Sequence, residues 1–209
     1  MKGLFALSTL IVAASSAVNG FVLPRQTNDD LSHFQGEWYE IGVTHNFNQM
    51  MQDIEDKYGF GCYCTRTSLE SSGDQSCEMS SVCEVRNDSS VIGDATATGT
   101  FDLKSVNGDR FTFDFTFGKL TLTPADNPGH EQELPGYPSS DQSHELQGEV
   151  ISTEHGTSFV VWSEYDGQVY GSLSHSERTV DDATFDQIVS QIDDTSIRDS
   201  MERYIYACE

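Results

Sequence analysis

The chain has 209 residues, with 34 acidic and 11 basic side chains and a formal net charge of −23. Such a surface repels nucleic acids and anionic lipid head groups, so we expect neither as a partner. The length suits one domain with a buried core. The acidic surface either keeps the protein dispersed or attracts cationic partners.

The first twenty residues have the layout of a cleaved secretory signal peptide. Met1-Lys2 gives a positive start, Leu4 to Val12 is mostly apolar, and residues 13–20 are rich in small side chains. The apolar core is shorter than the roughly 20 residues that span a bilayer, so no membrane span is expected. We predict that residues 1–20 form the signal peptide and that cleavage occurs after Ala17 or after Gly20. Residues 21–209 then form a single secreted domain.

Eight runs of alternating apolar and polar residues follow in chain order, as in half-buried strands. Asn107-Gly108 separates two of them and is a strong hairpin signal. Consecutive antiparallel strands remove their exposed edges by closing into a barrel. The fold class predicted is therefore all-β, an eight-stranded antiparallel up-and-down barrel. Its strands are expected at residues 38–43, 58–69, 76–86, 95–103, 111–117, 145–152, 158–164 and 168–174.

The pattern changes after the eighth strand. Phe185, Ile188, Val189 and Ile192 share one helical face, and Thr179 is the expected N-cap. We expect this C-terminal helix to pack outside the barrel, followed by another helical turn or a short strand. Two long connections, residues 45–57 and 124–143, are predicted as loops, the second one solvated.

Gly36-Glu37-Trp38-Tyr39, just before the first predicted strand, resembles the first signature of the lipocalin family. The run WYEIGVTHNFNQ, residues 38–49, is closest to the apolipoprotein D, bilin-binding and crustacyanin branch. The resemblance implies that Trp38 plugs the closed end of the barrel and that residues 45–57 cover its mouth.

Two departures mark the chain as an outlying member of that family. The second signature has only a loose echo in Ser163-Glu164-Tyr165-Asp166, one strand late. Arg178 is the candidate for the arginine that the third signature places across the tryptophan. It stands about two residues late against the helix start.

Five cysteines lie in the mature part, so disulfides are expected in a secreted protein. A turn centred between Ser72 and Gly73 places Cys62 opposite Cys83. A shift of two residues would exchange Cys62 for Cys64, and a shift of one would break the pairing. The same alternation puts the paired cysteines on the outer face.

A C-terminal tail that returns along the outside brings Cys208 to Cys64, and the lipocalin resemblance points the same way. Cys77 is then the free thiol. Zinc sites need ligands at matching spacing, and none is present, so no metal is expected. Asn87-Asp88-Ser89 is a candidate N-glycosylation acceptor.

A barrel of eight strands holds either a packed core or one small ligand. Periodicity alone does not decide which pair on the seventh predicted strand faces the barrel interior, Val160 and Trp162 or Phe159 and Val161. Filling of the barrel by its own side chains is the alternative to a ligand cavity. The residues predicted to line a cavity are Phe101, Phe111, Phe113, Phe115, Phe117 and Trp162.

The resemblance implies a carrier of a small apolar ligand, such as a pigment, retinoid, fatty acid or sterol. No cofactor is required. One alternative is a scavenger of cationic amines, which needs an acid such as Glu78, Glu84 or Asp114 to face the cavity. Another is a protein-binding module with a filled barrel. Six scattered histidines show no ligand or triad spacing, so an enzyme is not expected.

Overall fold

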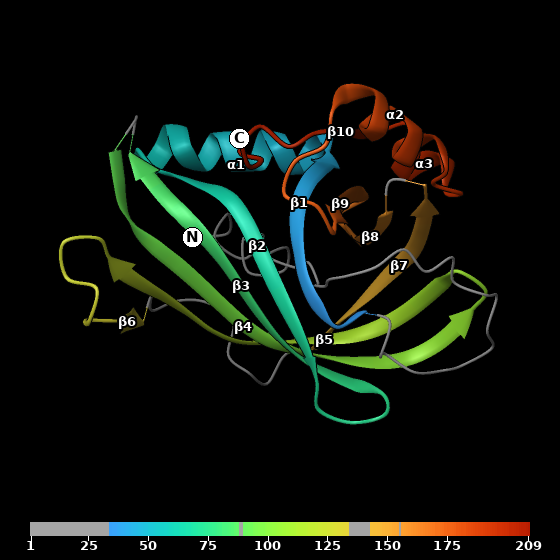
Figure 1. Cartoon of the computed structure of the whole chain (residues 1–209), viewed down its shortest axis with the longest axis horizontal. Coiled ribbons are helices and arrows are strands. Elements are labelled where there is room, and N and C mark those ends of the chain that lie inside the picture. The colour runs from blue at the N-terminus through green and yellow to red at the C-terminus, as the bar shows by residue number, and fades with distance from the viewer. Residues whose placement is uncertain (1–33, 88–89, 134–142, 155) are drawn as a thin grey trace.

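The computed structural model describes residues 34–87, 90–133, 143–154 and 156–209. Eight antiparallel strands follow one another around a barrel, and the last pairs with the first, so the sheet closes (Figure 1). This confirms the predicted fold class. The eight strands are β1 Gly36–Thr44, β2 Gly61–Ser71, β3 Ser76–Asn87, β4 Ser90–Asn107, β5 Arg110–Pro124, β7 Ser143–Thr153, β8 Gly156–Tyr165 and β9 Gln168–His175.

Two short strands extend the sheet outside the closed ring. β6 (Gln132–Glu133) pairs with β5, and β10 (Met201–Arg203) pairs with β1. The β4–β5 hairpin turns at the predicted place. Asn107 faces Arg110 across the turn, and Gly108 has a φ of 68°, a left-handed conformation that favours glycine.

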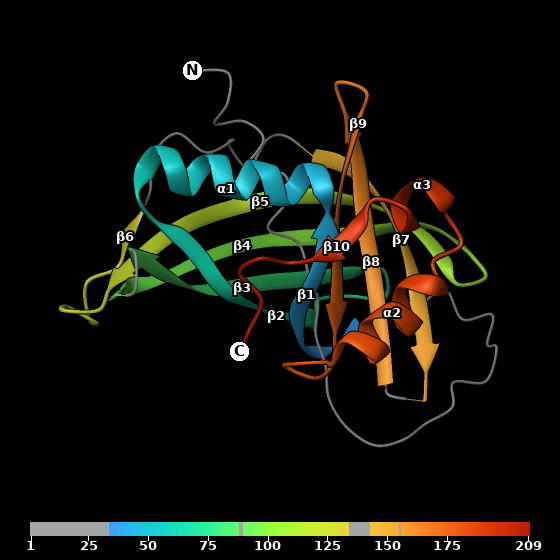
Figure 2. The same ribbon diagram turned by 90° about the horizontal axis from the view of Figure 1, so that it is seen from above.

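The predicted C-terminal helix is α2 (Asp182–Ser190), followed by the single turn α3 (Thr195–Arg198). Its N-cap is Asp181 rather than Thr179, because the Asp181 carboxylate accepts a hydrogen bond from the Thr184 N–H at 2.7 Å. Figure 2 shows both helices beside the barrel wall. Their apolar side chains pack on outward-facing residues of β1, β8 and β9, as the helical periodicity predicts.

The predicted loop over residues 45–57 is instead the helix α1 (His45–Tyr58). Phe47, Met50, Met51 and Ile54 stand at helical spacing and give this segment one apolar face. The helix ends at Gly59, whose φ of 74° and N–H bond to the Glu55 carbonyl form a left-handed C-cap. Figure 1 shows α1 lying across the end of the barrel to which β1 leads. We call this end the mouth.

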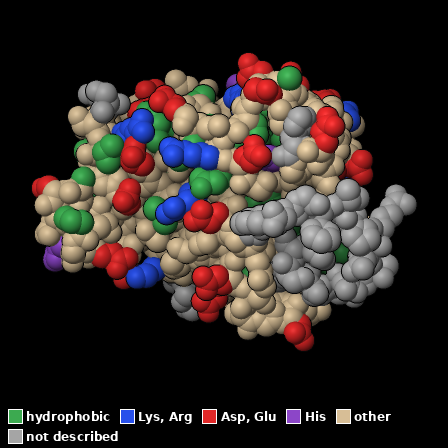
Figure 3. Space-filling model, in the orientation of Figure 1, with side chains coloured by type: hydrophobic (Ala, Val, Ile, Leu, Met, Phe, Trp, Pro, Cys, Tyr) green, Lys and Arg blue, Asp and Glu red, His purple; other side chains and the backbone are tan. Residues whose placement is uncertain are grey.

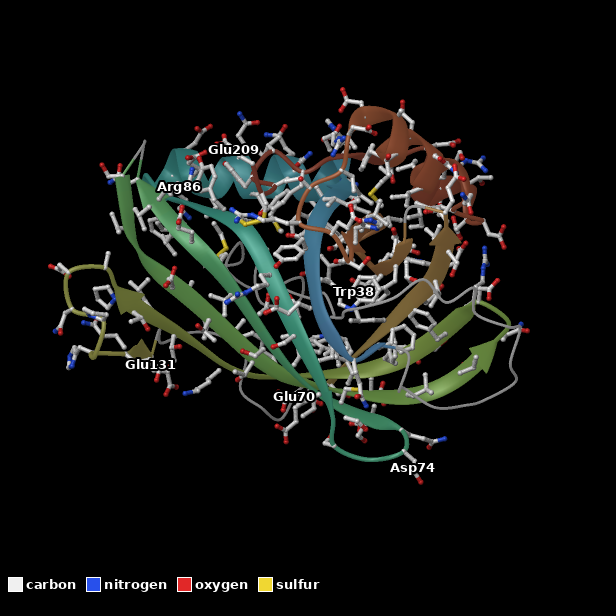
Figure 4. All side chains as sticks on the ribbon, in the orientation of Figure 1. Trp38, Glu70, Asp74, Arg86, Glu131 and Glu209 are labelled. Atoms are coloured by element: carbon white, nitrogen blue, oxygen red, sulfur yellow. A yellow bond between two sulfur atoms is a disulfide. The ribbon has the colours of Figure 1, made fainter. Side chains whose placement is uncertain are left out.

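Trp38 lies inside the opposite, closed end, near the start of β1 (Figure 4). Its ring packs edge-on against Phe159 with centroids 5.7 Å apart. Phe34 joins the same cluster through Phe111 at 5.0 Å and Phe159 at 5.6 Å. A large aromatic cluster therefore fills the closed end, and Trp38 is one of its members.

Among the described residues, no helix is both long and apolar enough to cross a membrane. Acidic side chains are scattered over the face in Figure 3 instead of forming one patch. The predicted signal peptide, residues 1–20, lies outside the described residues, as does the middle of the 124–143 connection.

Replacing Trp38 with alanine should lower the free energy of unfolding by about 3–5 kcal/mol, because it removes a fully buried ring. Urea denaturation followed by circular dichroism measures this. The matched control is Tyr165→Ala, at a residue in the β8–β9 turn that is 62% exposed, which should cost about 0.5 kcal/mol or less. Equal effects of the two changes would place Trp38 outside the core.

Candidate ligand site in the barrel

The closed half of the barrel interior is filled by aromatic rings. Phe101, Phe111, Phe113, Phe115 and Phe117 are all buried and face inward, as predicted. Neighbouring ring centroids among them lie 4.7–6.5 Å apart. The cavity between Leu69, Cys77 and the rings measures about 10 Å³. That is room for about one water, whereas small-molecule pockets hold roughly 300–1,000 Å³.

Trp162 is not a wall residue. It lies on the outer face of β8 in the cluster that packs against α2, with Val160 and Leu173. The out-of-phase pair Phe159 and Val161 faces the interior. The strand is buried on both faces, by the barrel core and by the helix, and therefore has no polar face that would reveal its phase in the sequence.

Toward the mouth, the side chains that line the interior become small. Thr65 and Thr67 of β2, Ser81 of β3 and Ser172 of β9 are buried, and Ala95 of β4 is half-buried. Thr67 donates a hydrogen bond to the Ser81 hydroxyl at 2.7 Å. These positions of the mouth half therefore carry hydroxyl and methyl groups in place of rings, and the larger side chains of Cys83, Val85 and Leu120 are buried at the same levels of the barrel.

Glu40 is the charged residue of this region, and a β-bulge places it there. The register between β1 and β9 shifts between Glu40 and Gly42. As a result Ile41 and Gly42 face α2, while Val43 joins the mouth cluster described below. Glu40 is 4% exposed, and its carboxylate accepts a hydrogen bond from Ser172 at 2.5 Å.

Burial raises the pKa of Glu40 from 4.5 to about 7, although hydrogen bonds from Ser172 and Thr65 oppose the rise. Desolvation dominates because no cation stands beside the carboxylate among the described ion pairs. The basic side chains of the neighbouring elements point elsewhere. Arg66 pairs with Glu37 at 3.5 Å, His175 bonds Ser158 at 2.8 Å, and Arg203 pairs with Asp182 at 2.9 Å.

The acids named for the amine alternative do not face the interior. Glu78 is exposed, Glu84 pairs with Arg86, and Asp114 pairs with Lys104 at 2.7 Å. Glu40 was missed, although the sequence held a signal for it. It stands two residues after Trp38, so strand alternation puts both on one face once Trp38 is taken as inward.

A cluster of tyrosines closes the mouth between α1 and the C-terminal tail. We call it the mouth cluster; its buried members are Val43, Phe47, Tyr204 and Tyr206, with Tyr63 packed against them. The ring of Tyr206 lies 4.6 Å from that of Tyr63, and both hydroxyls donate to the Glu55 carboxylate of α1. Burial is the main cause that raises the pKa of Tyr206.

The tail also joins two strands that diverge near the mouth. β1 and β2 pair only between residues 36–39 and 66–69. Beyond that point the Tyr204 N–H donates to the Ile41 carbonyl at 3.2 Å, and the Cys64 N–H donates to the Tyr206 carbonyl at 2.8 Å. The tail therefore bridges the gap and covers the Glu40 region.

The disulfides are the pairs predicted, Cys62–Cys83 and Cys64–Cys208. The predicted register is wrong, because Cys62 lies opposite Val85 and an irregularity follows at Cys64, whose φ is 51°. The predicted outward placement is wrong as well for Cys83, which is 4% exposed and shares the buried face of β3 with Cys77. A shifted register and a bulge together still bring Cys62 within 5.5 Å (Cα–Cα) of Cys83.

The remaining predicted residues are placed as follows. Gly36 has a φ of 115°, so the start of β1 needs glycine there. Arg178 is exposed and has no recorded contact with Trp38, whose indole N–H is buried without a hydrogen-bond partner among the described residues. Asn87 is exposed at the end of β3, and its glycosylation stays a prediction. In the described part of the chain, no group of three acids, histidines or cysteines could hold a metal.

Glu40 should make stability depend on pH. The native protein keeps this proton up to about pH 7, and the unfolded chain loses it near 4.5. Between these values the native state binds more protons, so stability falls as pH rises. Glu40→Gln should match wild type near pH 4.5 and exceed it by about 3 kcal/mol at pH 8. Urea titrations across that range measure the difference. Glu78→Gln should show no such trend, and a flat difference for Glu40→Gln would contradict the assignment.

Cys77 should be an unreactive thiol. It is fully buried, and burial raises the pKa of the thiol to about 11, so little thiolate forms at neutral pH. A colorimetric thiol reagent should therefore label no cysteine in the native protein and one in urea without reductant. Rapid labelling of the native protein would show that the closed half opens to solvent.

No protein-family model and no curated protein sequence matches the chain. Two solved structures resemble it at 12% identity and a TM-score of 0.45. One is the siderocalin Ex-FABP, described as having dual ligand specificities, with 84% of this chain and 94% of that chain covered. The other is the tryptamine complex of the amine binding protein of Rhodnius prolixus, with 92% and 86% covered. The fold assignment therefore rests on the strand order of the barrel itself.

Proposed function

We propose that this is a secreted binding protein that holds a small, largely apolar molecule in the mouth half of its barrel. One observation carries the proposal: the closed half is filled by rings, whereas several inward positions of the mouth half carry only threonine, serine or alanine. Binding, not catalysis, is the function proposed, and no cofactor is part of it.

Barrel geometry explains why small side chains matter. The number of strands and their stagger set the diameter of a barrel, so opposite walls stay apart whatever side chains they carry. Phenylalanine rings bridge this distance in the closed half. Thr65, Ser81, Ala95 and Ser172 are shorter than these rings, and the proposal places the ligand beside them, above the rings of the closed half.

Secretion is supported by the two disulfides, which form and persist mainly in oxidising compartments. The signal-peptide pattern of residues 1–20 points the same way. A relation to the apolipoprotein D, bilin-binding and crustacyanin branch of the lipocalins remains a prediction from residues 38–49. The same holds for the ligand classes named for that family.

Titration with retinol, a neutral apolar probe, tests the proposal by quenching of protein fluorescence. The wild type should bind it in the micromolar range or tighter. Ala95→Phe should weaken binding by about tenfold or more, because Ala95 faces inward, paired with Cys83 and Leu122, and a ring there takes up the space. Asp94→Phe is the matched control, since the neighbouring residue is exposed and should leave binding unchanged.

If Ala95→Phe and Asp94→Phe bind retinol equally well, the ligand does not lie in the mouth half. A wild type that binds neither retinol nor any other small probe would reject the carrier function. The protein-binding alternative would then gain weight. It would draw on exposed apolar side chains at the mouth: Tyr58 and Phe60 at and just after the end of α1, and Val91 and Ile92 at the start of β4.

A further inference from the structure

We infer that residues 201–208 form a strap that closes a side opening of the barrel between β1 and β2, and that the ligand enters and leaves there. The strap opens by moving away from β2 while its first part stays on β1. This inference rests on the proposed function and adds the route by which the ligand reaches the mouth half.

The first argument is the break in the pairing of β1 with β2. Their ladder covers only residues 36–39 of β1 and 66–69 of β2, although both strands continue toward the mouth. In the described chain no strand pair joins residues 40–44 to residues 61–65. The backbone groups of a wall strand need hydrogen-bond partners, so another segment has to supply them. The strap does so, and at this place it takes the position of a wall strand.

On the β1 side the strap is held by a regular ladder. β10, the first part of the strap, pairs with residues 42–44 of β1. The bond from the Tyr204 N–H to the Ile41 carbonyl at 3.2 Å continues this ladder by one step. The β1 side is therefore the side that stays attached.

On the β2 side the contacts are fewer and irregular. The backbone bond runs from the Cys64 N–H to the Tyr206 carbonyl at 2.8 Å. The Tyr204 hydroxyl donates to the Cys62 carbonyl at 3.3 Å. The Cys64–Cys208 bridge adds the covalent tie. No ladder joins the strap to β2 in the described residues, so this side opens once the bridge and these bonds are released.

Asn48 of α1 holds the strap from the mouth side. Its amide group donates to the Glu202 carboxylate and to the Arg203 carbonyl, each at 2.8 Å. Its oxygen accepts a bond from the Ile205 N–H at 3.2 Å. Asn48 is 5% exposed, so water does not compete freely for these bonds. One side chain of the helix thus binds three residues of the strap.

The strap lies over the groups proposed to line the ligand site. Tyr204 and Tyr206 are buried, whereas Ile205 between them is 50% exposed, so the strap turns two rings inward. Glu40 of β1 and Thr65 of β2 stand beside the break, and the Glu40 charge helps to raise the pKa of Tyr204. Release of the strap therefore uncovers the interior of the mouth half.

Lifting α1 is the alternative route. The helix begins at His45, directly after β1, and Gly59 and Phe60 alone separate its end from β2. Both of its ends are therefore fixed to wall strands by the chain itself. Asn46 also donates to the Val169 carbonyl of β9 at 3.3 Å. The helix cannot swing out without moving β1 or β2, whereas the strap can move away from β2 alone.

Stopped-flow fluorescence with retinol measures the association and dissociation rates. The test variant is Cys64→Ser/Cys208→Ser, which removes the covalent tie on the β2 side. A gate changes both rates by the same factor, because the closed complex keeps the same ligand contacts. We expect both rates to rise by about tenfold, with Kd within about twofold of wild type. Circular dichroism confirms that the variant is folded.

A second variant keeps both disulfides. Asn48→Ala removes the three bonds between α1 and the strap and should raise both rates by about fivefold. Gln49→Ala is the matched control on the same helix. Gln49 is exposed and bonds Asp53 at 2.9 Å, so its loss should leave the rates unchanged. If the bridge variant does not fold, this pair decides.

Hydrogen exchange without ligand follows the strap itself. In Asn48→Ala a peptide that covers residues 201–208 should exchange about tenfold faster than in wild type, because local opening becomes more frequent. β9 should keep its protection, since its ladders with β1 and β8 are untouched. Exchange that rises equally in both segments would indicate general loosening and overturn the inference.

The outcomes separate the two proposals. If wild type binds retinol and both variants keep its rates, the inference is overturned and the carrier function stands. The same holds if only dissociation becomes faster, because the strap is then a fixed part of the site and not its entrance. Faster exchange of the strap without faster binding also overturns it. If wild type binds no retinol, the carrier function is rejected and the entry route with it.

Discussion

The pairing of β1 with β9 is the contact on which the rest of the structure depends, because it turns a sheet into a closed barrel. The bulge in this pairing has two effects. Outside, it lets Gly42 lie under Phe185, where a Cβ would come within 2.7 Å of the ring, so α2 packs directly on the strand. Inside, it holds Glu40 against Ser172. One irregularity thus sets both the helix position and the candidate site.

The two ends of the interior are built for different tasks. At the closed end, rings of phenylalanine and tryptophan interlock and supply the hydrophobic stabilisation of the fold. At the mouth, the strands are tied together by the Cys64–Cys208 bridge and by the tail that joins β1 to β2. Because these ties lie at the edge of the mouth, they do not need large side chains inside the mouth half.

The sequence predicted those features that depend on local periodicity. Alternation located all eight strands, and helical spacing located α2. Prediction failed where tertiary context decides. Which side chains of β8 face inward was ambiguous, because the strand is apolar and buried on both of its faces around Trp162. The register of β2 against β3 depends on a bulge at Cys64, which local sequence does not mark.

The candidate site was predictable only in part. The inward phenylalanines were identified, but whether rings leave a cavity depends on how they meet across the barrel, which no single strand encodes. On β4, Gly99 lies against the ring of Phe115, which leaves no room for a ligand there. The inward position of Glu40 could be predicted only by combining strand alternation with the expectation that Trp38 plugs the closed end. To predict how the mouth is covered, residues 45–57 had to be recognised as a helix.

The central claim is that a ligand lies in the mouth half of the barrel, above the rings of the closed half. A crystal structure of the protein grown with retinol tests it most directly. We expect the ligand on the mouth side of Phe113 and Phe115, with the rings of both residues unmoved. A ligand inserted among those rings, or bound on the outer surface, would contradict the claim.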